Sequence, residues 1–155
     1  MSTDKYANIN KYEIYGGSLK IATSNIEIKS ADASNGDIFR VATLPIIATI
    51  VKVEIGTTAL TSATDNDLGF YKVNGGDVVD VDILADGQSL ATASKSIEGL
   101  KDVSVANMNK TIKDLYKAVN STGTALNNEK YVDVALTINT APTANGNISV
   151  KIYYI

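Results

Sequence analysis

The chain has 155 residues, enough for one domain with a buried core and too few for a sizeable second domain. Its net charge of −3 and its single arginine, Arg40, argue against nucleic-acid binding, which needs a basic surface. Cysteine and histidine are absent, which excludes disulfides, thiol nucleophiles and imidazole metal ligands. We therefore expect no nucleic acid and no cofactor, and any catalysis would rest on carboxylates, lysine, tyrosine or hydroxyl groups.

The first part of the chain after residue 17 indicates two strands joined by a turn. Residues 18–29 alternate in part between apolar and charged side chains, the period-two pattern of a half-buried strand. Asn35-Gly36 supplies the positive φ that a tight turn needs. A second strand over residues 38–44 follows, and Pro45 should end it or place it at a sheet edge.

The clearest strand pattern is IATIVKVEI at residues 47–55, where β-branched residues alternate with Lys52 and Glu54. It overlaps the longest apolar run, residues 41–51, which is too short to span a bilayer, so we expect no membrane association. We expect one face of this strand to point into the core, and that face carries Ile47, Val51, Val53 and Ile55.

Four more strands are predicted in the rest of the chain. Residues 68–73 and 77–84 flank an Asn-Gly-Gly turn, which indicates a strand, a turn and a further strand. Residues 131–138 and 147–155 both alternate, and the turn-rich segment between them predicts an antiparallel hairpin.

One helix is predicted around residues 109–119, where apolar residues recur at helical spacing and Asn107 or Asn109 is the expected N-cap. Many short strands with one helix predict an all-β fold, an antiparallel β-sandwich or a jelly roll. We expect residues 1–155 to form a single domain, with residues 1–17 as an N-terminal arm.

Residues 64–87 carry six aspartates and four glycines, which raises the question of a metal or acid–base site. The spacing fits no EF-hand loop, although Asp65 and Asp67 remain candidate ligands for an irregular calcium site. Asp80 and Asp82 fall on one face of a predicted strand, whereas a glycosidase pair must face each other across a cleft. The interpretation we favour is a turn and a polar strand face.

Several of the eight tyrosines lie near the two ends of the chain. Tyrosine is common at interfaces because it combines an apolar ring with a hydroxyl group that stays hydrated. Packing at a strand edge and contact with another protein are both consistent with this distribution. The candidate interface residues are Tyr6, Tyr12, Tyr15, Tyr153 and Tyr154.

Four segments resemble a family of small virion structural proteins from tailed bacteriophages. They are GDIFRVATLP, TDNDLGFYKVNGGDVVDVDILADG, NKTIKDLY and YVDVALTINTAPTANGNISVKIYYI, and the second is the most specific. They occur in the family's order and cover most of the chain, while the N-terminal part matches less well. The resemblance implies a β-rich structural protein of the virion and carries no catalytic residues.

On this basis we expect a capsid auxiliary, or decoration, protein at the head surface that binds and stabilises the assembled shell. Its expected partners are the major capsid protein or other virion proteins and further copies of itself, a trimer being the first candidate for the homo-oligomer. The alternative is a head-fibre or tail-associated module that contacts host glycans. We expect no enzymatic activity, because a carboxylate-based hydrolase would need a deep cleft with two perturbed carboxylates.

Overall fold

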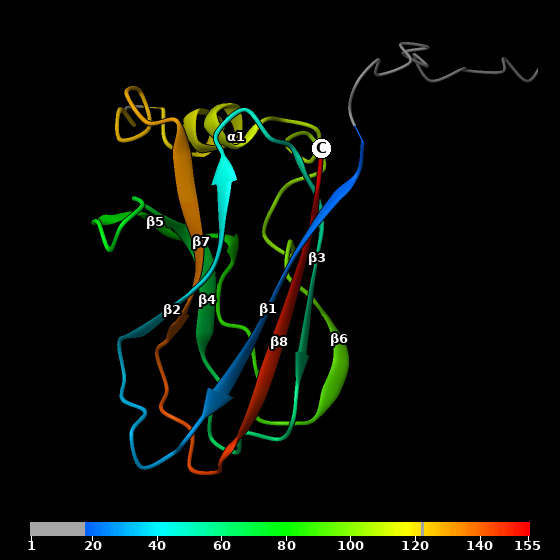
Figure 1. The fold of residues 1–155 in the computed structure, drawn as a ribbon, viewed down its shortest axis with the longest axis vertical. Helices are drawn as coiled ribbons and strands as arrows, with labels where there is room; N and C mark the ends of the chain where they lie inside the picture. The colour runs from blue at the N-terminus through cyan, green and yellow to red at the C-terminus, as the bar shows by residue number, and fades with distance from the viewer. Residues whose placement is uncertain (1–17, 122) are drawn as a thin grey trace, which may run out of the picture.

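A computed structural model describes residues 18–121 and 123–155. Within these residues, eight strands form two antiparallel sheets packed face to face, and one helix lies at one end of the sandwich (Figure 1). The elements are β1 (Lys20–Ile28), β2 (Asp37–Pro45), β3 (Ile50–Thr57), β4 (Asn66–Tyr71), β5 (Val78–Ala85), β6 (Ser94–Glu98), α1 (Ile112–Val119), β7 (Tyr131–Ile138) and β8 (Gly146–Tyr154).

The strand order identifies the sandwich as a jelly roll. Sheet A has the order β1-β8-β3-β6 and sheet B has the order β2-β7-β4-β5. The first strand therefore pairs with the last, the second with the seventh, the third with the sixth and the fourth with the fifth. This nested pairing is the jelly-roll arrangement, so the predicted β-sandwich class is confirmed.

The predicted C-terminal hairpin is wrong. β7 pairs with β2 and β4 in sheet B, whereas β8 pairs with β1 and β3 in sheet A. The segment between them crosses from one sheet to the other. Alternation of side chains marks a strand with a buried face but does not determine which strand pairs with it, so a turn-rich link was mistaken for a hairpin.

The strand predicted at residues 47–55 begins later and turns at a bulge. β3 starts at Ile50, and the register with β8 shifts between Ile50 and Lys52. Because of this shift, Val51 is exposed and Ile47, which precedes the strand, is 78% exposed. Both were expected in the core, and Ile50 is buried instead. β6 was not predicted because its sequence, SKSIE, is short and polar, as an edge strand tolerates.

The helix begins at Ile112, later than the range expected around 109–119, and Thr111 is its N-cap rather than Asn107 or Asn109. The Thr111 hydroxyl accepts a hydrogen bond from the Asp114 backbone N–H at 3.2 Å and donates to the Asp114 carboxylate at 2.9 Å. The first helical N–H, that of Ile112, donates to the carbonyl of Ala48 in the β2–β3 connection. The helix therefore closes one end of the sandwich and buries its apolar side chains, Ile112, Leu115 and Tyr116, there. No helix among the described residues is long and apolar enough to cross a membrane.

The two sheets differ in how many of their faces are buried. In β4 every residue is buried, and in β7 every residue except Tyr131 is buried. In β8, by contrast, only alternate residues such as Ile148, Val150 and Ile152 are buried. The central strands of sheet B are therefore covered on both faces, whereas sheet A packs one face on the core and leaves the other open.

Candidate functional site

A cluster of three carboxylates forms where loops from both sheets meet. Oxygen atoms of Asp65, Asp67 and Asp86 all lie within 4.8 Å of one another. The structure thus brings together the two predicted calcium candidates and adds Asp86, which the sequence spacing did not suggest. Asp86 joins the cluster because β4 pairs with β5, which brings the end of β5 beside the start of β4. This pairing has no local signal in the sequence.

Asp67 is the buried member of this cluster, and its carboxylate also holds the loops together. One oxygen accepts a hydrogen bond from the Gly87 N–H at 3.0 Å, and the other accepts from the Asn139 side-chain amide at 2.6 Å. The charge of Asp67 is the largest cause that raises the pKa of Asp86. Three oxygen donors of this kind suit a hard cation such as calcium, so Asp65 and Asp67 stay candidate ligands, and the interpretation favoured from the sequence, a turn and a polar strand face, stays a prediction.

Asp80 and Asp82 lie on one face of β5, as predicted, and interact with each other. Burial raises the pKa of Asp80 to about 6, and a hydrogen bond with Asp82 and its negative charge add to the effect. They are neighbours on a single strand, so they do not form a pair of carboxylates facing each other across a substrate. The pair is therefore two neighbouring carboxylates that interact along one face of β5.

The open face of sheet A carries a polar cluster around Tyr153. The Tyr153 hydroxyl donates to a Glu54 oxygen at 3.0 Å, and the Lys52 ammonium lies 2.7 Å from the other Glu54 oxygen. The same ammonium lies 5.9 Å from the centre of the Tyr153 ring. The hydrogen bonds from Lys52 and Tyr153 lower the pKa of Glu54, and the bond with Glu54 raises the pKa of Lys52. In this cluster the Tyr153 ring contacts both the Glu54 carboxylate and the Lys52 ammonium, which form an ion pair.

The other predicted interface tyrosines are placed differently. Tyr154 is half-buried and packs against the core, so its ring faces the inside of the sandwich. Tyr6, Tyr12 and Tyr15 lie outside the described residues. Of the candidates that the structure describes, Tyr153 alone lies on the open face of sheet A.

The polar part of this face continues toward the other end of the sheet. An open groove of about 550 Å³ is lined by polar side chains that include Asn25, Lys95 and Ser149. The open face of sheet A thus combines one aromatic side chain, that of Tyr153, with lysines and small polar groups.

A hydrogen-bond network around Arg40 covers part of the outer face of sheet B. The sequence pattern did not predict this role for the single arginine. Its guanidinium donates to Asp133 at 2.8 Å, to the Lys72 carbonyl at 2.6 Å and to the Gly76 carbonyl at 2.8 Å. The Thr43 hydroxyl donates to the second Asp133 oxygen at 2.6 Å. The side chain therefore ties β2, β7 and the β4–β5 turn together and has a structural role.

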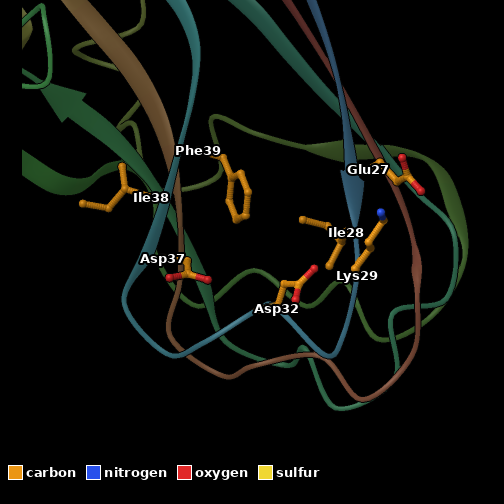
Figure 2. A pocket seen from close by; sticks show the side chains of 8 residues that line it. Glu27, Ile28, Lys29, Asp32, Asp37, Ile38 and Phe39 are labelled. Carbon is orange, nitrogen blue, oxygen red and sulfur yellow. The ribbon is translucent and has the colours of Figure 1, made fainter.

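A hollow of about 290 Å³ lies between β1 and β2, the edge strands of the two sheets. Figure 2 shows Phe39 from β2 and Ile28 from β1 pointing toward each other across it. Asp32 and Asp37 stand at the rim with Lys29. Within residues 18–121 and 123–155, neither sheet has a further strand on this side of the sandwich.

Solved structures that match the chain include chains from two phage capsids, whereas no protein-family model and no curated protein matches it. The chain from "Cyanophage Pam1 capsid asymmetric unit" has a TM-score of 0.52 and 16% identity, with 99% of this chain and 91% of that chain covered. The chain from "Capsid of Ralstonia phage GP4" has a TM-score of 0.61 and 16% identity, with 90% of this chain and 84% of that chain covered. At such low identity the likeness establishes a shared fold.

Proposed function

We propose that this protein is a phage virion structural protein that binds the assembled head and stabilises it. The observation that carries the proposal is the match of nearly the whole jelly roll to chains from two phage capsids. The resemblance of four sequence segments to virion structural proteins of tailed phages supports the same role independently.

The proposed mechanism is selective binding to the assembled shell. A protein that binds the lattice but not the dissociated subunits shifts the equilibrium toward the lattice by mass action. The open face of sheet A around Tyr153 is the contact surface we assign to this binding, because the outer face of sheet B is already covered by its own side chains. We expect copies to associate, with a trimer at local threefold positions as the expected form.

The copy number of the chain in purified virions tests this function. Quantitative mass spectrometry against the major capsid protein should give about one copy per shell subunit, or one trimer per local threefold position, as symmetric decoration requires. A few copies per particle would replace the proposal with the fibre or tail alternative, for which glycan binding would then be measured. Absence from the particle would refute a virion role altogether.

A second experiment tests stabilisation itself. Particles lacking this protein should release their genome at a lower temperature than complete particles, and adding back the purified protein should restore the difference. Equal heat resistance of the two kinds of particle would contradict the stabilising mechanism. It would not contradict a location in the virion, which the copy number tests separately.

A further inference from the structure

The hollow between β1 and β2 is lined by apolar side chains that the core leaves partly uncovered. Ile28 of β1 is buried, and Phe39 of β2 is half-buried and points toward Ile28 across the hollow (Figure 2). Ala33, in the loop that joins the two strands, also lines it. Phe39 and Ala33 pack against the core without being fully buried by it. An aromatic ring in an open hollow is a surface that a ligand can cover.

The rim of the hollow carries more negative than positive charge. Four charged residues line it, namely Glu27, Lys29, Asp32 and Asp37, and among the described residues none of them forms an ion pair. Lys29 points away from both aspartates (Figure 2). One Asp37 oxygen accepts a hydrogen bond from the Ser34 N–H at 2.7 Å, which leaves the other oxygen for a further donor. The rim therefore offers two carboxylates that have no cationic partner beside an aromatic ring.

A guanidinium group suits both parts of this hollow. It is planar and weakly hydrated, so it can stack on an aromatic ring while its N–H groups donate to carboxylates. Its five donors in a fixed fork match carboxylate oxygens better than the point charge of a lysine ammonium does. The aliphatic stem of an arginine side chain would cover the apolar lining. A hollow of about 290 Å³ is small for a ligand site, so it suits one side chain rather than a folded segment.

We propose that the hollow between β1 and β2 binds one arginine side chain of a partner protein, whose guanidinium contacts Asp32, Asp37 and the Phe39 ring. A second copy of this chain does not supply that arginine. Its single arginine, Arg40, already donates to Asp133 and to two backbone carbonyls. The partner is therefore a different protein with an exposed arginine. The inference does not depend on the proposed virion role.

A titration followed by NMR tests the site on the full chain. The probe is a terminally blocked Gly-Arg-Gly peptide, and two matched peptides carry lysine or the neutral arginine analogue citrulline in its place. We expect amide shifts confined to residues 27–39. The arginine peptide should bind about tenfold more tightly than the citrulline peptide and also more tightly than the lysine peptide. No binding, equal binding of the three peptides, or shifts centred elsewhere would overturn the proposal.

Two variants test which groups hold the guanidinium. Asp32→Asn removes one charge and should weaken binding of the arginine peptide about fivefold or more. Phe39→Leu keeps an apolar side chain but removes the ring, so it should also weaken binding. The matched control, Asp114→Asn, removes the same charge on α1, at the other end of the sandwich (Figure 1), and should leave binding unchanged. Equal losses in Asp32→Asn and in the control would show a general effect of net charge and would overturn the site.

A third probe separates a partner's side chain from a small organic cation. Methylguanidinium has the arginine head group without the aliphatic stem or the peptide backbone. It should therefore bind about tenfold or more weakly than the arginine peptide, because it covers less of the apolar lining. Methylguanidinium binding as tight as that of the peptide would assign the hollow to a small cation and would overturn the assignment to a partner protein.

Discussion

Sheets A and B belong to one sandwich but differ in the burial of their outer faces. Sheet B covers its outer face with its own groups: the Arg40 network, a hydrogen bond of 2.6 Å between the hydroxyls of Tyr71 and Thr137, and the backbone of β5, which passes over Gly69. Sheet A has exposed polar side chains there, and among the described residues no strand lies beyond β1. The difference indicates that sheet B serves stability, while sheet A is free to make contacts.

The largest effect should come from removing the acidic centre of the sheet B network. Asp133→Ala leaves the Arg40 guanidinium without its carboxylate partner in a partly buried site and should destabilise the protein by about 3 kcal/mol. The matched change on sheet A, Glu54→Ala, removes a more exposed partner and should cost distinctly less. Urea unfolding of both variants measures the two values, and equal costs would contradict the difference between the faces.

Two glycine substitutions compare how tightly the backbone packs in the two sheets. A Cβ at Gly69 would collide with the backbone of Asp80 and Val81, so Gly69→Ala should cost about 2 kcal/mol or more. A Cβ at Gly56 in sheet A would meet its nearest atom, the Lys95 carbonyl oxygen, at 3.4 Å, so Gly56→Ala should be nearly neutral. Thermal unfolding of both variants checks this, and a tolerated Gly69→Ala would show that the backbone of β5 does not lie tightly against Gly69 of β4.

The Asp80–Asp82 pair predicts a smaller effect that depends on pH. Because the pKa of Asp80 is raised to about 6, its contribution to stability is present below its ordinary value and is lost as the pH rises through 6. Asp80→Asn should therefore stabilise the protein at pH 8 by about 1 kcal/mol, a value reduced for the solvent screening of a half-exposed group. The gain should shrink toward pH 4, and a gain independent of pH would contradict this origin.

The smallest effect on stability, and the most informative for contacts, is expected at Tyr153. Tyr153→Phe removes the hydrogen bond to Glu54 on the open face and should leave the free energy of unfolding nearly unchanged. If this face meets the particle, a Tyr153→Ala variant should bind particles less tightly while remaining folded. Co-sedimentation with particles that lack the protein measures binding, and unchanged binding by the alanine variant would exclude Tyr153 as a contact.

Much of the fold follows from local pattern in the sequence. Period-two alternation located the strands around Ile26, Val53 and Val134, and the positive φ at Gly36 fits the turn predicted there. The partners of the strands did not follow, because alternation is the same whichever strand lies alongside. The bulge that turns Val51 outward was equally invisible, since it depends on pairing with β8.

The candidate sites were less predictable because they depend on residues far apart in the chain. Asp65 and Asp67 were identified by their own spacing, but Asp86 joins them only through the pairing of β4 with β5. The structural role of Arg40 depends on Asp133 and was not recognised from either residue alone. Tertiary contacts of this kind have no local sequence signal beyond a charged residue within a strand pattern.

Lysine footprinting on intact particles tests the central claim, that the open face of sheet A meets the phage head. Lys52, Lys95 and Lys151 lie on or beside this face, whereas Lys113 and Lys117 lie on α1 at the end of the sandwich. Acetylation quantified by mass spectrometry should be several-fold lower on the first three lysines in particles than in the free protein, and unchanged on the helix lysines. Protection of the helix lysines alone, or of none, would contradict the assignment of sheet A as the contact face.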